Sequence, residues 1–298
     1  MTQHYHKSRI METIKNDKLT LTISEHGAEL LSIKDNGGEE YLWQGDPAYW
    51  GRRSPILFPI VGTVWGNTYR VNGREYQLSR HGFARDKDFT LLAKGDSQVV
   101  YGLHDNAETM KVYPFHFNLA VSYKLTGNKI HVVWHVENTD DKPIYFQIGG
   151  HPAFMVPGAK KGEPLKGALR FDNPEPMRVF ISKEGFLTKG YHKVATDKGL
   201  FPFTEDTFND DAIVFDHSQI RHVELLDEAG KPHVTLDIKT PAVGIWTPCG
   251  KHAPFICIEP WYGVADREEY DGELKDKYLT NKLLPGSSFM SEYIITIG

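Results

Sequence analysis

Hydrophobic and polar residues alternate along four segments that are spread over the whole chain. Residues 19–24, 130–137 and 234–239 each place apolar side chains at every second position, and residues 289–297 again look like a strand, with Ser291 interrupting the apolar positions. Successive side chains of a β-strand point to opposite faces, so a period of two is typical of a strand with one buried face. These segments are predicted to be half-buried strands. In the second of them, His131 and His135 fall on the face opposite Trp134 and are expected to be exposed.

Short clusters between the strand segments permit tight turns. Residues 35–38, 71–73, 126–128 and 228–230 each contain Gly, and the first three also contain Asn. Both residue types tolerate the positive φ angles that hairpin turns require. Long amphipathic helical stretches are scarce, and only residues 264–284 are expected to hold a short helical turn. The pattern predicts an all-β protein, built as a large antiparallel sandwich or barrel.

The length of the chain changes this picture little. A chain of 298 residues is long enough for two average domains. No linker-like tract or internal repeat divides it, however, and residues 11–298 are predicted to form a single domain. The patterned sequence opens at Met11, so residues 1–10 are expected to be a leader or a disordered N-terminus.

Charge and cysteine content exclude several classes of protein. The formal net charge of −5 gives no basic footprint for nucleic acid, and no apolar run is long enough to cross a membrane. Cys249 and Cys257 are too few for a disulfide framework or a Cys-rich zinc site. Reduced thiols and a cytoplasmic location are therefore expected. Cys257 lies in an apolar run and is predicted to be a small buried residue.

Two segments depart from plain strand patterning through basic residues. Arg52 and Arg53 lie within the apolar, proline-framed segment 50–62. An arginine there either points to solvent or serves a concave polar site. Downstream, His81 is followed by Gly82, which allows a close approach of the backbone. Each feature alone is also typical of structural residues.

Two further segments carry groups suited to acid–base chemistry. His151 follows two glycines at the end of an apolar run, where a rigid scaffold can present it to a cleft. Glu259 follows the apolar run 255–258 and precedes Trp261 and Tyr262. Apolar surroundings raise the pKa of a carboxyl group unless it is paired or hydrogen-bonded, so Glu259 is a candidate general base. Aromatic residues beside polar ones suit a sugar, whose C–H faces stack on rings.

Several familiar catalytic motifs are absent. The sequence contains no His-Glu-x-x-His, no P-loop, no Gly-x-Ser-x-Gly and no dinucleotide-binding fingerprint. The sequence also has no clear cluster of metal ligands, which a metal-dependent lyase or hydrolase would need. We therefore expect neither a metal nor another cofactor.

Together, the unusual segments resemble the aldose 1-epimerase (galactose mutarotase-like) family, and most closely its LacX-type branch. The likeness rests on residues 40–46, on Arg52 with 55–62, and on 81–85, 150–154 and 259–263, in the order of the family. It implies a large β-sandwich with a concave sugar-binding face. By the same resemblance His81, His151 and Glu259 are catalytic. Arg52 and an aspartate bind the substrate; the aspartate is best matched by Asp211, although Asp210 is adjacent.

The resemblance implies a mutarotase, which interconverts the α and β anomers of a free aldohexose such as galactose or glucose. Glu259 would act as base at the C1 hydroxyl and His151 as acid at the ring oxygen, while His81 positions the sugar. Arg52 and Asp211 would hold other hydroxyls, and Trp261 would stack on the ring. The expected partner is a small sugar, with the protein a monomer or homodimer.

The sequence leaves two alternative functions open. One is a hexose-phosphate mutarotase, for which Arg53, Arg80 and Arg85 could hold the phosphate. The other is a non-catalytic carbohydrate-binding or sensor protein on the same scaffold.

Overall fold

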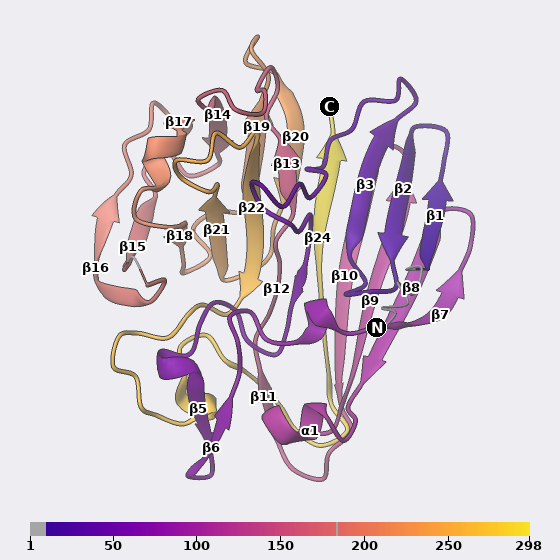
Figure 1. Ribbon diagram of the computed structural model, residues 1–298, viewed down its shortest axis with the longest axis vertical. Coiled ribbons are helices and arrows are strands. Elements are labelled where there is room, and N and C mark those ends of the chain that lie inside the picture. The colour runs from indigo at the N-terminus through magenta and orange to yellow at the C-terminus, as the bar shows by residue number, and fades with distance from the viewer. Residues whose placement is uncertain (1–9, 183) are drawn as a thin grey trace, which may run out of the picture.

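The computed structural model describes residues 10–182 and 184–298, and it is built almost wholly from antiparallel strands (Figure 1). The first large sheet has nine strands. In spatial order they are β17 (Leu200–Thr204), β14 (Lys166–Phe171), β19 (His222–Leu226), β20 (Pro232–Asp237), β24 (Ser288–Ile297), β10 (Lys129–Asn138), β9 (Phe117–Thr126), β8 (Gln98–His104) and β7 (Thr90–Lys94). All four segments with a period of two are strands here or in the small N-terminal sheet.

The second large sheet has eight strands and carries the candidate site. Its order is β16 (Leu187–Lys193), β15 (Met177–Ile181), β18 (Ile213–Phe215), β21 (Ala242–Trp246), β22 (Phe255–Tyr262), β12 (Ile148–Gly150) and β4 (Ile56–Leu57), and β13 (Ala153–Met155) pairs with β22 beside β12. The two sheets face each other across the largest core cluster, which contains Ile256 and Ile258 of β22 and Trp134 of β10. The predicted antiparallel sandwich is confirmed.

Smaller elements complete the fold. Strands β1 (Met11–Lys15), β2 (Leu19–Ser24) and β3 (Leu30–Asp35) form a sheet over the β8–β9 end of the nine-stranded sheet (Figure 1). There are also two sheets of two antiparallel strands: the hairpin of β5 (Thr68–Val71) and β6 (Arg74–Gln77), and the long-range pair of β11 (Ile144–Phe146) with β23 (Asn281–Leu283). The helices are α1 (Thr109–Val112) and the 3₁₀ turns η1 (Trp65–Asn67), η2 (Ala84–Asp86), η3 (Glu205–Phe208) and η4 (Leu274–Asp276).

The predicted turns lie where glycine geometry is needed. Gly127 has φ +59° in the two-residue turn between β9 and β10. Asn72 and Gly73, with φ +52° and +75°, form the turn between β5 and β6. The short helical turn expected within residues 264–284 is η4.

One expectation about exposure needs correction. His131 and His135 do lie on the face of β10 opposite the buried Trp134, but both are half-buried rather than exposed. Nδ1 of His131 lies 2.7 Å from Oε1 of Glu292 on the neighbouring strand β24, and this pairing covers part of the ring. Of the expected leader, residues 1–9 lie outside the described residues. Ile10 is already joined to the fold, because its carbonyl accepts a hydrogen bond from the backbone N–H of Glu25.

No helix within residues 10–182 and 184–298 is both long and apolar enough to cross a lipid bilayer.

The alternation along β10 yields a matched test of the core. Trp134→Ala removes a fully buried ring and is expected to lower the free energy of unfolding by about 3–5 kcal/mol. His135→Ala, one residue along the strand on the other face, should change it by less than about 0.5 kcal/mol. Urea unfolding followed by tryptophan fluorescence and circular dichroism measures both. Equal effects would contradict the assignment of the two faces.

Candidate active site

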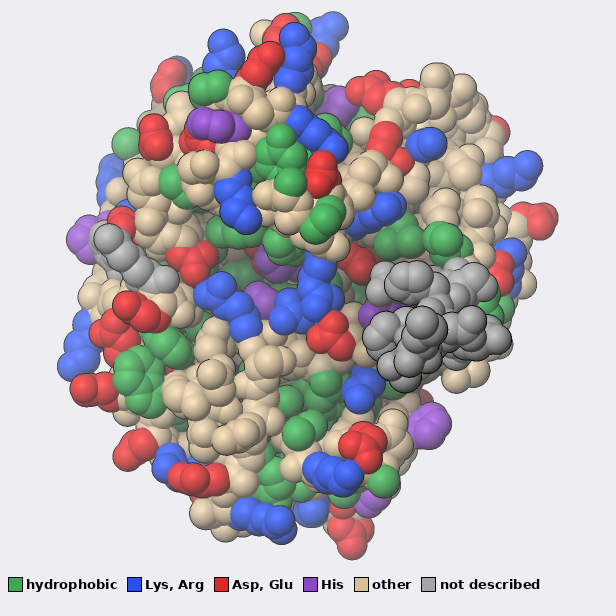
Figure 2. Space-filling view, in the orientation of Figure 1, with side chains coloured by type: hydrophobic (Ala, Val, Ile, Leu, Met, Phe, Trp, Pro, Cys, Tyr) green, Lys and Arg blue, Asp and Glu red, His purple; other side chains and the backbone are tan. Residues whose placement is uncertain are grey.

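A cavity of about 380 Å³ opens on the eight-stranded sheet, on the face that does not meet the nine-stranded sheet. In the space-filling view it is a hollow that contains histidine side chains and is flanked by Lys and Arg side chains (Figure 2). Five of the predicted site residues lie in its lining: His81, His151, Asp211, Glu259 and Trp261. The fold therefore brings together residues that are up to 180 positions apart, between 81 and 261.

Strand β22 supplies the base of the cavity through its period of two. Ile256 and Ile258 point into the core between the sheets, whereas Glu259 and Trp261 line the cavity. Both faces of this strand are covered, which explains why residues 255–258 form a continuous apolar run. Glu259 is only 1% exposed. Its carboxyl group is thus held at the bottom of a narrow opening rather than in free solvent.

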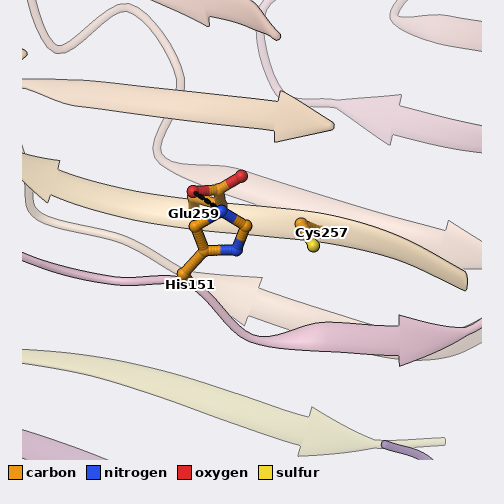
Figure 3. A group of neighbouring side chains, drawn as sticks. All are labelled: His151, Cys257 and Glu259. Carbon is orange, nitrogen blue, oxygen red and sulfur yellow. Dashed lines mark ion pairs between the residues drawn. The ribbon is translucent and has the colours of Figure 1, made fainter. Parts of the chain in front are cut away.

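A break between two short strands places His151 beside Glu259. Gly149 of β12 pairs with Trp261, and Ala153 of β13 pairs with Cys257, so His151 lies between the two pairings and opposite Glu259. Nε2 of His151 is 3.1 Å from Oε2 of Glu259 (Figure 3). The two atoms are within ion-pair distance but not aligned as a hydrogen bond. A proton can move between them directly or through a bound hydroxyl.

Glycine at position 150 is what allows this arrangement. A Cβ atom there would lie 2.9 Å from the hydroxyl of Tyr293 and 3.3 Å from the ring of Trp134, both of the opposite sheet. The chain just before His151 is therefore pressed against the core.

Aromatic rings fix the orientation of the His151 imidazole. The ring of Trp50 stacks on it, with centroids 4.8 Å apart and planes at 28°. Trp246 and His81 meet it edge-on, at centroid distances of 5.7 and 5.6 Å. These three contacts leave the imidazole little freedom to rotate.

His81 is held in an unusual backbone conformation. Its φ is +68°, and its N–H donates to the carbonyl of Gly62 at 2.7 Å. The N–H of Gly62 donates in turn to Nδ1 of His81 at 3.0 Å. Because Nδ1 accepts, the neutral ring carries its proton on Nε2. His81 therefore offers an N–H donor from its Nε2 edge.

Burial sets the charge of the catalytic candidates. It raises the pKa of Glu259 well above its ordinary value, and the negative charge of Asp211 raises it further. It lowers the pKa of His151 to about 3, with the nearby cation Arg85 adding to the effect. Burial, followed by the charge of His151, also lowers the pKa of His81 well below its ordinary value. These shifts favour the neutral form of the Glu259–His151 pair, in which the carboxyl group is protonated and the imidazole is uncharged.

Asp211, rather than Asp210, is the aspartate of the cavity. Asp211 lines the cavity, and its Oδ2 forms an ion pair with Nη2 of Arg80 at 3.0 Å. Arg80 is anchored again by Thr63, whose Oγ1 accepts from Nε at 3.1 Å. Asp210 is exposed and is not among the lining residues. A positive φ of +71° at Asp211 turns the chain so that adjacent carboxylates diverge.

Arg52, which is predicted to contact the substrate, is not among the residues that line the cavity. Its guanidinium pairs with Asp86 at 2.8 Å. After burial, the positive charge of Arg52 is one of the influences that lower the pKa of His81 and His151. Arg53 is structural, since its Nη1 donates to the carbonyl of Leu31 and to Oε1 of Gln44. The arginines that do line the cavity are Arg80 and Arg85.

Sequence reasoning did not find the aromatic part of the site. Tyr49, Trp50 and Trp246 line the cavity together with Lys251. Trp246 closes the apolar strand β21, and Trp50 precedes the two arginines, so both resemble ordinary core or turn residues. Trp261, by contrast, is 5% exposed and packs tightly over Gly244, where a Cβ atom would lie 2.6 Å from its ring.

Comparisons with known proteins identify the family of this chain. The family model for aldose 1-epimerase matches residues 11–268. The chromosomal and plasmid LacX proteins of Lactococcus lactis subsp. lactis are each 33% identical to the chain over 301 residues, which cover 95% of this chain and 98% of theirs. The chain belongs to the aldose 1-epimerase family. It is accordingly an epimerase of the sugar-mutarotase type.

Solved structures within this epimerase family are similar over almost the whole chain. A galactose mutarotase related enzyme from Lactobacillus acidophilus is 35% identical, with a TM-score of 0.90 and 97% of each chain covered. A galactose mutarotase-like protein from Lactobacillus casei is 34% identical, with a TM-score of 0.92. That match covers 97% of this chain and 100% of the other. The resemblance inferred from five short motifs is thus confirmed.

A pair of glycine substitutions tests how closely the backbone holds His81. A Cβ atom at Gly82 would lie 2.3 Å from the carbonyl oxygen of Phe58, whereas at Gly73 it would meet nothing within 4 Å. Both glycines have positive φ, +69° and +75°. Gly82→Ala and Gly73→Ala should share a φ strain of roughly 1–2 kcal/mol. Only Gly82→Ala should add an overpacking cost of about 1–3 kcal/mol.

Displacement of His81 should also be seen in catalysis. We expect Gly82→Ala to slow sugar epimerisation about 100-fold, the typical cost of a misplacement near 1 Å, and Gly73→Ala to leave it unchanged. Thermal unfolding and polarimetry of both variants measure the two effects. A Gly82→Ala protein with unaltered rate would show that His81 need not be held there.

Proposed function

We propose that this epimerase interconverts the α and β anomers of a free aldohexose, such as galactose or glucose, by acid–base opening and closure of the ring. The observation that carries the proposal is the pairing of Glu259 with His151, 3.1 Å apart and lining the cavity. Mutarotation needs one base and one acid close together and no redox step. A general acid and a general base each contribute about 10²–10⁴-fold.

In the proposed reaction, Glu259 takes the proton of the C1 hydroxyl while the bond between C1 and the ring oxygen breaks. His151 gives a proton to that ring oxygen, and the open aldehyde forms. Rotation about the bond between C1 and C2 presents the other face of the carbonyl group. Closure reverses both proton transfers and restores the pair.

This order of events requires the pair to enter the reaction as carboxylate and imidazolium. Burial favours the neutral pair in the empty cavity, so the proton of Glu259 must pass to His151 when the sugar binds. Hydroxyl groups of the sugar aid this transfer, because they hydrogen-bond to both charges and replace the solvation that burial removed. The number of protons on the pair stays at one throughout the cycle.

Other lining residues position the sugar in this proposal. His81 donates from Nε2 to the ring oxygen or a neighbouring hydroxyl. Asp211 and Arg80, which already pair, hold hydroxyls farther from C1. Trp50 and Trp246 are half-buried and line the cavity, so they offer more ring surface to the sugar than the buried Trp261 does. Arg52 pairs with Asp86 and its charge acts on His81 and His151, so it remains a further candidate to hold a sugar hydroxyl.

Replacement of the carboxyl group tests the assignment of the base. Glu259→Gln keeps the shape of the side chain and removes its ability to accept a proton. We expect the rate of mutarotation of galactose or glucose, followed by polarimetry, to fall by roughly 10²–10⁴-fold with the thermal midpoint preserved. Glu292→Gln serves as the matched control, because Glu292 pairs with His131 on the nine-stranded sheet.

The same experiment separates an enzyme from a sensor. Full activity in Glu259→Gln would remove Glu259 from the mechanism. A wild-type protein that is stabilised by a sugar, yet does not accelerate anomer exchange, would favour the non-catalytic alternative.

A specific observation supports a second candidate, a hexose-phosphate mutarotase. Among the described residues, Arg80, Arg85 and Lys251 are cationic and line the cavity. Arg80 pairs with Asp211. Arg85 is largely buried, and its Nε lies 3.9 Å from Oδ2 of Asp86 but has no hydrogen-bond partner. An anionic group on the substrate would complete these interactions.

Substrate comparison distinguishes the two candidates. Lys251 is exposed at the cavity and donates to the carbonyl of Tyr49 at 3.1 Å. If the substrate is phosphorylated, Lys251→Met should raise KM for glucose 6-phosphate about tenfold, the effect of one lost interaction near 1.4 kcal/mol, and leave glucose unaffected. Polarimetry with both sugars measures the difference. Equal rates on both sugars in both proteins would exclude a phosphate subsite at Lys251.

A cytoplasmic setting is part of the proposal. Its support is that Cys249 and Cys257 are both unpaired, and that Cys249 is exposed.

A further inference from the structure

Three neighbouring side chains at the base of the cavity carry atoms that can act as ligands of a divalent metal ion such as Zn²⁺. One ligand atom each of His151, Cys257 and Glu259 lies within 4.8 Å of the other two, and all three residues are buried. Cys257 and Glu259 are two positions apart on β22 and so share a face, on which the imidazole of His151 also lies (Figure 3). The cluster thus combines an imidazole, a thiol and a carboxyl group.

Two of these residues have polar atoms that the described protein leaves without partners. Nδ1 of His151 and Oε2 of Glu259 are buried and lack hydrogen bonds. Buried polar atoms are nearly always satisfied, so unpartnered atoms on two neighbouring residues indicate that a ligand can complete their interactions. A substrate hydroxyl can do so, but the thiol of Cys257 adds a group that sugar chemistry does not use.

We propose that His151, Cys257 and Glu259 form a binding site for a borderline-soft divalent cation of the Zn²⁺ type, and that a bound ion blocks the catalytic pair. Nitrogen, sulfur and carboxylate ligands are the set that Zn²⁺ prefers, whereas Mg²⁺ and Ca²⁺ prefer oxygen alone. Binding releases the protons of the thiol and of the carboxyl group. Thiolate and carboxylate then balance the two positive charges, which a buried site requires.

Access and coordination number follow from the position of the cluster. His151 and Glu259 line the cavity, so an ion entering from solvent meets them first. Cys257 lies behind them in a small apolar cluster with Ala153 and Phe255, and is fully buried. Three protein ligands leave a fourth tetrahedral position open toward the cavity for water. An ion held there occupies the lone pairs that would handle protons at C1 and the ring oxygen.

The site itself does not depend on the proposed reaction, and a spectroscopic titration tests it alone. Co²⁺ replaces Zn²⁺ in such sites, and a cobalt–thiolate bond absorbs in the near ultraviolet. We expect this band in the wild-type protein, saturating at a single ion per chain. It should persist in Cys249→Ala, which removes the exposed thiol, and vanish in Cys257→Ala. Competition with Zn²⁺ should remove it.

Three results would overturn the site. They are an absent band in the wild-type protein, a band that is lost in Cys249→Ala instead, and an unchanged band in Cys257→Ala. Should Cys257→Ala fail to fold, Cys257→Ser preserves the size of the side chain, and the comparison of wild type with Cys249→Ala remains decisive.

Inhibition is measured separately, as the ratio of mutarotation rates with and without Zn²⁺ for each protein. We expect Zn²⁺ to lower the rate at least tenfold in wild type and Cys249→Ala, and Mg²⁺ to have no effect. Loss of the thiol should weaken inhibition by at least the roughly 10–100-fold that loss of an outer partner costs a metal site. Equal sensitivity to Zn²⁺ in Cys257→Ala would overturn the proposal. A wild-type protein without mutarotation would instead refute the proposed function and leave the cobalt titration to decide the metal site.

Discussion

The exclusion of water from both faces of β22 is the constraint on which the site depends. One face of this strand packs into the core between the two large sheets through Ile256 and Ile258. The other face carries Glu259 and Trp261, which line the cavity, and Cys257 behind them, and each of the three is at most 5% exposed. A carboxyl group in that position loses its hydration, and this burial, with the charge of Asp211 added, raises its pKa well above the ordinary value.

Close backbone approach provides the neighbours. Gly150 and Gly82 each stand where a Cβ atom would collide, the first with the opposite sheet and the second with the carbonyl of Phe58. These contacts fix the chain beside His151 and His81, and rings and backbone groups then fix the imidazoles. Burial shifts the pKa of Glu259 upward and that of His151 downward, which is one effect acting on an acid and on a base. The result is a neutral pair, in which Glu259 is protonated and His151 is uncharged.

A second consequence of this burial is that several polar side-chain atoms near the cavity have no hydrogen-bond partner in the protein. Native proteins seldom leave such atoms without partners, because each costs about 1–3 kcal/mol. Within the described residues, Arg85, His151, Glu259 and Trp261 each line the cavity and carry such an atom, as expected where stability is given up for function. The same unsatisfied lone pairs that can handle the protons of a sugar also make the site open to a competing cation.

The sequence by itself determined the architecture class. A period of two survives in β10, β20 and β24 because each has one covered and one open face, and Gly-containing turns delimit the strands. Glycine beside His81 and His151 also marked these segments, since glycine is needed wherever the backbone approaches closely. Family motifs then indicated Glu259. These are local signals, and local signals can be read from one chain.

Only the tertiary structure decided which residues share the cavity. Arg52 and Arg80 both belong to segments that depart from strand patterning, but Arg52 pairs with Asp86, whereas Arg80 lines the cavity and pairs with Asp211. Trp50 and Trp246 are indistinguishable from core residues until the sheet brings them against His151. Such contacts depend on strand order and register across long sequence separations, because what a side chain meets is set by the neighbouring strands rather than by its neighbours in the chain.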